Sequence, residues 1–135
     1  MMPSGGGPHV FVSEIDAPDL EVPDLHHLAN VLRLSEGDPL TISDGEGRWR
    51  RCRFGRSVEP IGDVVMVAPP DVEITIGFSL IKGRRPDLVV QKLTELGVDR
   101  IVPLSAARSV VRWDQAKARA QHERLLRVAR EAGMQ

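Results

Sequence analysis

The clearest pattern of hydrophobic and polar positions lies in the second half of the chain. Two apolar runs, residues 74–81 and residues 101–104, each predict a buried strand. Between them, Pro86 stands where a helix would begin and Gly97 stands where it would end. Together these signals predict a strand–helix–strand unit.

Helical spacing supports two helices in this half. In the first, Val89, Leu93 and Leu96 are expected to line one apolar face. The second is expected to run from an N-cap at Asp114 to about residue 132, with Leu125, Ala129 and Ala132 on its packed face.

The first half predicts short strands joined by turns. The expected strands are residues 9–13, 40–43, 48–54 and 58–67. Residues 44–47, Asp-Gly-Glu-Gly, are typical of a hairpin turn, and Asp44 begins it. A short helix over residues 25–32 is expected after an N-cap at Asp24. Several short strands with intervening turns favour a small β-barrel.

Residues 68–71, Ala-Pro-Pro-Asp, predict a boundary between two domains, residues 1–70 and residues 71–135. Two prolines cannot continue a central strand. The charge also changes sign here: residues 1–71 hold 6 Lys and Arg against 12 Asp and Glu, whereas residues 72–135 hold 12 against 7. The basic half is the better candidate for meeting phosphates.

Composition narrows the possible classes of protein. No apolar run approaches the roughly 20 residues that span a bilayer, and residues 1–8 are expected to be a frayed start rather than an export signal. The single cysteine, Cys52, is interpreted as an inert thiol, which together with the missing signal favours the cytoplasm. His26 and His27 are adjacent and lack the spacing of metal ligands, so no metal site is expected.

Positive charges follow both predicted strands of the basic half. Lys82, Arg84 and Arg85 come after the first strand, and Arg108 and Arg112 come after the second. Open α/β sheets place ligand sites at the carboxyl ends of their strands, and arginine forms bidentate bonds to phosphate. Lys82, Arg84, Arg85 and Arg108 are therefore candidate phosphate contacts, with solvated loop charges as the alternative.

Other polar and aromatic residues leave two interpretations open. Gln91, Lys92 and Glu95 form either a functional surface or a polar helix face with pairs at i+3 and i+4. Trp49 and Trp113 are either base-stacking residues or packing residues, the latter at the start of the last helix for Trp113. The arginines of residues 48–56 are either a basic stripe or the wet face of a hairpin.

Taken together, the ordered motifs resemble the RsmE-type 16S ribosomal RNA (uracil-N3)-methyltransferases of the SPOUT superfamily. The matching segments are H-H-L-A-N-V-L-R-L-S-E-G-D (26–38), D-G-E-G (44–47), K-G-R-R-P-D (82–87), Q-K-L-T-E-L-G-V (91–98), I-V-P-L (101–104), A-R-S-V-V-R-W (107–113) and E-A-G-M-Q (131–135). Each motif alone is weak, but their order and spacing are specific, and they cover the chain from about His9 onward.

The resemblance implies an α+β fold. Its first part is a PUA-like small β-barrel that helps hold RNA, and its second part is the opening βαβα portion of an α/β-knot methyltransferase domain. It also implies S-adenosylmethionine as cofactor, a homodimer, and 16S ribosomal RNA or the small ribosomal subunit as partner. Arg33, which follows the His-His-Leu element, and Lys92 join Lys82, Arg84, Arg85 and Arg108 as expected RNA contacts.

The family's glycine-rich cofactor loop, G-P-E-G-G, is not found in residues 1–135. No catalytic or cofactor-binding residue is therefore assigned, and this chain alone is expected to be inactive as the front part of a longer enzyme. The alternative is a non-catalytic RNA-binding barrel with a dimerising α/β appendage.

Overall fold

The computed structural model describes residues 7–134, and its contacts divide the chain into two units. The first extends to Pro69 and also takes in Met134, and the second is Pro70–Gly133. The expectation of a frayed start falls mostly on residues 1–6, which lie outside the described residues, as does Gln135 of the last matching motif.

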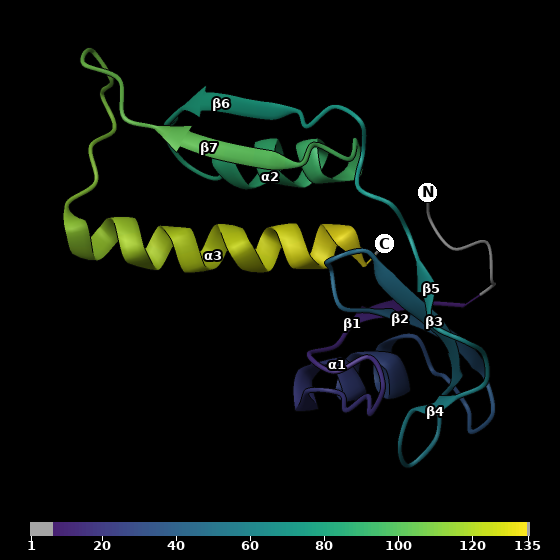
Figure 1. The fold of residues 1–135 in the computed structure, drawn as a ribbon. Helices are drawn as coiled ribbons and strands as arrows, with labels where there is room; N and C mark the ends of the chain where they lie inside the picture. Colours follow the sequence, from purple (N-terminus) through teal and green to yellow (C-terminus); the bar gives the residue numbers. More distant parts are fainter. Residues whose placement is uncertain (1–6, 135) are drawn as a thin grey trace. The chain divides into compact units, whose positions relative to one another are not determined.

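A five-stranded sheet forms the first unit (Figure 1). Its strands are β1 (His9–Phe11), β2 (Pro39–Ser43), β3 (Arg48–Arg53), β4 (Glu59–Pro60) and β5 (Val65–Met66). β1 pairs in parallel with β2, β3 pairs antiparallel with β2, and both β4 and β5 pair with β3. The single strand expected over residues 58–67 is wrong, because a loop containing Gly62 separates β4 from β5. Arg50 holds that loop, since its Nη2 donates to the carbonyl of Gly62 at 2.7 Å.

The predicted hairpin turn is confirmed between β2 and β3. Asp44 Oδ1 accepts hydrogen bonds from the backbone N–H groups of Glu46 (2.8 Å) and Arg48 (3.1 Å). Gly47 has a φ of 101°, and a side chain there would meet the carbonyl oxygen of Val67 at 2.9 Å. The turn therefore needs glycine at this position for both conformation and space.

The predicted short helix begins earlier than the sequence suggested. α1 covers Val22–His26 and continues as the π-helical turn η1, His27–Val31. The expectation that Asp24 is the N-cap is wrong: Asp24 lies inside α1 and is buried, and Glu21 is the N-cap. Pro23 explains the early start, because its fixed φ suits the first turn of a helix.

The core of the first unit gathers under one face of the sheet. Leu28, Leu40 and Ile42 are each at most 1 % exposed, and Cys52 is fully buried beside them. Burial raises the pKa of the Cys52 thiol to about 11. The interpretation of Cys52 as an inert thiol agrees with this environment.

A polar network lies on the opposite face of β1 and β2. His9 Nδ1 is 2.8 Å from Thr41 Oγ1 and its Nε2 is 2.9 Å from Ser43 Oγ, while Phe11 meets the imidazole edge-on. Burial lowers the pKa of His9 below its ordinary value of 6.5. A neutral imidazole satisfies both hydroxyl groups because one ring nitrogen donates and the other accepts.

This network predicts a pH-dependent loss of stability. The pKa of His9 is lower in the folded chain than in the unfolded chain, so below pH 6.5 the unfolded chain binds more protons. The free energy of unfolding therefore falls as the pH drops. His9→Gln removes this titration. Urea unfolding between pH 7.5 and pH 5 is expected to show a steeper decline for the natural chain than for His9→Gln. Parallel declines would contradict the role of His9.

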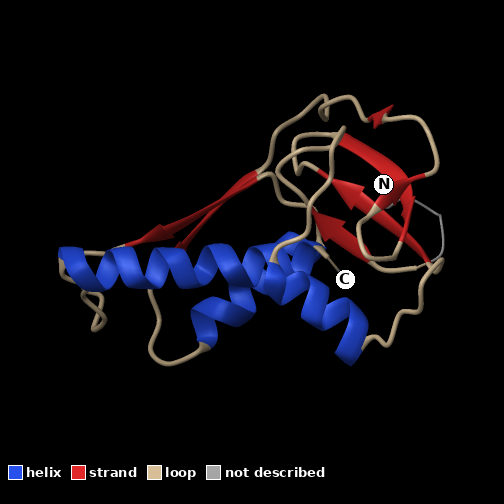
Figure 2. Ribbon diagram, turned by 90° about the horizontal axis from the view of Figure 1, so that it is seen from below, coloured by secondary structure: helices blue, strands red, loops and turns tan. Residues whose placement is uncertain are grey.

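The second unit is built from two strands and two helices. β6 (Thr75–Ser79) and β7 (Arg100–Leu104) form a two-stranded parallel sheet, followed in turn by α2 (Arg85–Glu95) and α3 (Gln115–Gly133). α2 packs against α3 (Figure 1), and Figure 2 shows the helices from below in blue.

Local capping signals in this unit are confirmed. α2 ends at Gly97 with a φ of 75°, where the N–H of Val98 bonds the carbonyl of Leu93 at 3.0 Å, the bond that defines a Schellman motif. Asp114 caps α3, since its Oδ1 accepts from the N–H of Lys117 at 2.8 Å.

The expected apolar faces are only partly right. Leu125 and Ala132 of α3 are buried as predicted. In α2 the buried residues are Pro86 and Val90, whereas Leu96 is 79 % exposed, so its place on the packed face is wrong. Leu96 is the C-cap, where the chain already turns away from the helix.

Candidate nucleic-acid interface

The carboxyl ends of β6 and β7 lie at one end of the second unit. Figure 1 shows both arrowheads on the same side as the start of α3. Lys82 and Arg85 therefore follow one strand into the region that Arg108 and Arg112 reach from the other. Because β6 and β7 are parallel, their carboxyl ends meet at one edge, and the positively charged residues that follow both strands lie there as expected.

An apolar hollow of about 600 Å³ opens at this edge. Its floor comes from Leu80 and Ile81 after β6 and from Val110 and Val111 in the loop after β7, and its lining also includes Lys82, Arg85 and Arg108. Ser109 joins the two loops, because its Oγ donates to the carbonyl of Leu80 (3.3 Å). Three of the six expected RNA contacts thus lie around one cavity.

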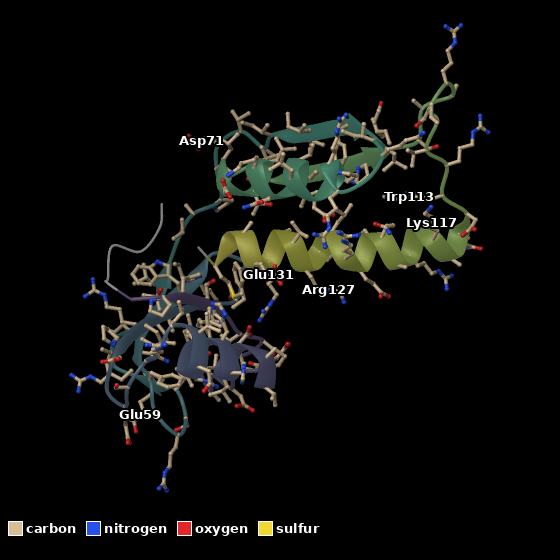
Figure 3. All side chains as sticks on the ribbon, turned by 180° about the vertical axis from the view of Figure 1, so that it is seen from behind. Glu59, Asp71, Trp113, Lys117, Arg127 and Glu131 are labelled. Carbon is tan, nitrogen blue, oxygen red and sulfur yellow. The ribbon has the colours of Figure 1, made fainter. Side chains whose placement is uncertain are left out.

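A second, polar hollow of about 400 Å³ adjoins the first. The two share Lys82 and the neighbouring apolar residues of both loops. The polar hollow adds Arg112, Trp113 and side chains from the first turns of α3: Lys117, Gln121 and Arg124. Figure 3 labels Trp113 and Lys117 together at the start of α3, far along the helix from Glu131.

An ion pair between the two helices supports the polar hollow. Arg124 Nη2 of α3 donates to Asp87 Oδ2 in the first turn of α2, and both side chains are largely shielded from solvent. The carboxylate of Asp87 is also well placed for the positive end of the α2 dipole. The pair neutralises Arg124 and leaves Lys82, Arg112 and Lys117 as the cations of the hollow.

The other three expected contacts lie elsewhere. Arg84 is the exposed N-cap residue of α2 and lines neither hollow. Lys92 bonds Glu95 at 2.6 Å and Gln91 bonds Glu95 at 3.0 Å, which confirms the two predicted local pairs. The hydrogen bond from Lys92 lowers the pKa of Glu95.

Arg33 belongs to the first unit, where it is exposed and follows η1. It has a φ of 56°, in the left-handed region that residues with a side chain rarely occupy. Within the second unit, Lys92 therefore lies outside the group formed by Lys82, Arg85 and Arg108.

Sequence reasoning missed Lys117, Gln121 and Arg124. Their spacing of i, i+4 and i+7 places them on one side of α3, and a polar stripe at the start of that predicted helix was the signal that could have found them. Arg112 follows the second predicted strand but was not among the expected RNA contacts.

The arginines of β3 divide between structural and exposed roles. Arg48 pairs with Asp16 at 2.8 Å, and Arg50 is held by Gly62. Arg51 and Arg53 are exposed on the other face of the strand. A continuous basic stripe along β3 is therefore reduced to these two residues.

None of the helices in residues 7–134 combines the length and apolarity that a membrane span requires. Residues 7–134 also hold no group of three or more His, Cys, Asp or Glu side chains arranged to bind a metal ion.

Comparison with known families accounts for both halves of the chain. Residues 20–56 match the family described as an RNA methyltransferase PUA domain, and residues 68–135 match the RNA methyltransferase domain. The chain belongs to the RNA methyltransferase domain family. The predicted fold class is confirmed: a PUA-like first part is followed by the opening of an RNA methyltransferase domain.

Curated relatives confirm the predicted resemblance. Ribosomal RNA small subunit methyltransferase E of Bacillus subtilis is 32 % identical over 118 residues, which are 83 % of this chain and 46 % of that protein. The Mycobacterium tuberculosis protein of the same name is 34 % identical over 117 residues, covering 81 % of this chain and 44 % of that protein. The chain spans about half the length of the curated relatives it matches.

Solved structures of this family resemble the chain closely. A Legionella pneumophila methyltransferase with bound S-adenosylmethionine superposes with a TM-score of 0.78 at 25 % identity, over 92 % of this chain and 55 % of that one. Ribosomal RNA small subunit methyltransferase E from Neisseria gonorrhoeae, also with bound S-adenosylmethionine, superposes with a TM-score of 0.71 at 26 % identity. The match covers 93 % of this chain and 55 % of that one.

Proposed function

We propose that this chain provides the RNA-holding part of an S-adenosylmethionine-dependent methyltransferase that acts on N3 of a uridine in 16S ribosomal RNA. The proposal rests on the ordered match to ribosomal RNA small subunit methyltransferase E through both a PUA domain and a methyltransferase domain. Residues 1–70 would be the PUA-like RNA-binding domain, and residues 71–135 the opening part of a SPOUT methyltransferase domain. A cytoplasmic homodimer is part of the same proposal.

The chemistry of N3 explains what such a chain must do. N3 of uridine keeps its proton at neutral pH, so transfer requires removal of that proton or stabilisation of the developing anion. N3 also lies on the pairing edge, so the target base must be unpaired or turned outward. Bound S-adenosylmethionine supplies the methyl group. Unpaired RNA is held through phosphates and stacked bases, which suits cations gathered beside a cavity.

Neither hollow suits S-adenosylmethionine. This cofactor carries a sulfonium, an ammonium and one carboxylate group, so its net charge is positive, and the lining residues of both hollows include cations but no carboxylate. Like charges at short range disfavour such a ligand. We therefore assign no residue of this chain to the cofactor and no catalytic residue, and we assign the cationic edge to RNA.

The expected RNA contacts of the apolar hollow are Lys82, Arg85 and Arg108, with Arg84 beside them. Arg33 and Lys92 remain part of the proposal as separate contacts. Neither residue lines the two hollows, and Arg33 belongs to the PUA-like unit.

Replacing Arg108 tests this proposal. In Arg108→Ala, affinity for a single-stranded ribosomal RNA oligonucleotide is expected to fall several-fold, and the slope of log K against log salt to decrease by about 1, because one phosphate contact is lost. Arg108 is exposed, so the thermal midpoint should not change. Arg119→Ala, on the exposed side of α3, is the matched control and should bind normally.

Three results would count against the proposal. Loss of folding in Arg108→Ala would make Arg108 structural. Equal weakening by Arg119→Ala would point to non-specific charge attraction. Absence of salt-dependent RNA binding by the natural chain would overturn the proposed function itself.

A further inference from the structure

The polar hollow combines one aromatic wall with unpaired positive charge. Trp113 is half-buried in its lining, one turn before Lys117. Lys82 enters from the loop after β6. Among the described residues, neither Lys82 nor Lys117 has an ion-pair partner, whereas Arg124 is neutralised by Asp87. The hollow thus offers two free ammonium groups beside an indole ring.

The Asp87–Arg124 pair gives this arrangement its position. It ties the beginning of α2 to the polar stripe of α3 that carries Lys117 and Gln121. Lys117 lies three residues after the Asp114 cap, and its backbone N–H donates a hydrogen bond to Asp114 Oδ1. The start of α3 is therefore a rigid platform for a ligand rather than a loose loop.

We infer that the polar hollow binds one unpaired nucleotide of the RNA, with Trp113 stacked on its base and with Lys82 and Lys117 contacting its flanking phosphates. The inference rests on the proposed function and adds a subsite to it. The volume of about 400 Å³ lies within the range of small-ligand sites. Stacking on tryptophan accepts any base, and lysine acts as a point charge toward phosphate, so this subsite holds RNA without reading its sequence.

RNA fits the hollow better than an acidic protein segment does. Carboxylates could form ion pairs with the lysines but would leave the indole ring without a stacking partner. The side chain of Gln121, in the same wall, adds an amide that can donate to or accept from a base edge. Only a ligand that carries both a flat ring and a phosphate uses all of these groups.

Tryptophan fluorescence gives a direct test. The chain contains two tryptophans, so Trp49→Phe leaves Trp113 as the only one. Titration of Trp49→Phe with a single-stranded oligouridylate is expected to quench the fluorescence of Trp113. An oligonucleotide of the same length with abasic sugars should bind more weakly and quench little, and inorganic phosphate should not quench.

Substitutions separate stacking from charge. In the otherwise natural chain, Trp113→Ala is expected to weaken oligouridylate binding about tenfold, while Trp113→Phe retains most of it. Lys117→Ala should lower the salt slope by about 1. Arg119→Ala is the control on the same helix, and circular dichroism of each variant should match that of the natural chain.

Each contrary outcome has a separate meaning. Salt-dependent RNA binding without quenching of Trp113, and with normal binding by Trp113→Ala, overturns this subsite and leaves the proposed function standing. Competition by polyglutamate as strong as that by RNA identifies an acidic protein ligand instead and overturns the inference. No RNA binding by the natural chain overturns both proposals.

Discussion

Ile42→Ala is expected to lower the free energy of unfolding of the first unit by about 2–5 kcal/mol. Ile42 is fully buried in β2, belongs to the same core cluster as Leu28 and Leu40, and pairs with Val10 of β1. The substitution removes buried methyl and methylene groups and leaves a cavity that the paired strands cannot close, because β2 is fixed by β1 on one side and by β3 on the other.

Urea unfolding followed through Trp49 measures this loss, because Trp49 pairs with Ser43 at the end of the same strand. Trp113→Phe serves as the background, so that the signal comes from the first unit alone. Ile61→Ala is the matched control: Ile61 is 52 % exposed, and its truncation should cost less than about 0.5 kcal/mol. Equal effects of the two substitutions would show that the core is not packed as described.

Arg124→Ala is expected to destabilise the second unit by about 1–2 kcal/mol. Charged hydrogen bonds contribute roughly 1.5–3 kcal/mol, and exposed ion pairs contribute less than about 1 kcal/mol. The Asp87–Arg124 pair lies between these cases, since its side chains are 23 % and 34 % exposed. Without Arg124, the partly buried carboxylate of Asp87 loses its partner at the contact between α2 and α3.

A double-mutant cycle with Asp87→Ala isolates the pair. If the ion pair carries the effect, the double variant should be hardly less stable than either single variant. Additive losses would instead assign the effect to packing of the arginine side chain. Lys92→Ala is the control, because the exposed Lys92–Glu95 pair should contribute little to stability.

Local chemistry predicted the ends of the elements well. The Asp44 turn, the Gly97 helix end and the Asp114 cap depend on residues within four or five positions of each other, and all three are confirmed. The strand–helix–strand unit was equally readable, because long apolar runs leave few alternatives. The expected burial of its strands is wrong, because β6 is largely exposed and β7 is only partly buried.

Three other features were predicted less well. Asp24 was expected to cap a helix that Pro23 begins one turn earlier. Leu96 has the spacing of a packed residue but follows the point where α2 ends. Residues 58–67 have the composition of one strand, yet the bond from Arg50 to Gly62 shapes their middle as a loop. In the first two cases a local signal decides, namely Pro23 and the helix end before Gly97, and only in the third does a tertiary contact override local preference.

The candidate site was predicted in part for the same reason. Lys82, Arg85 and Arg108 converge because parallel strands end at one edge, which the sequence pattern implies. The contribution of Trp113 and Lys117 depends on where α3 begins and on how it packs against α2, and these are tertiary facts. The family resemblance could indicate that RNA is the ligand, but it could not indicate the polar hollow beside Trp113.

The burial of Cys52 has a practical consequence for labelling. Burial raises the pKa of the Cys52 thiol to about 11, so almost none of the buried thiol is ionised at pH 7. A cysteine introduced at an exposed position such as Arg119 would therefore react with maleimide far faster than Cys52. Spectroscopic probes can be attached to this chain without first replacing its natural cysteine.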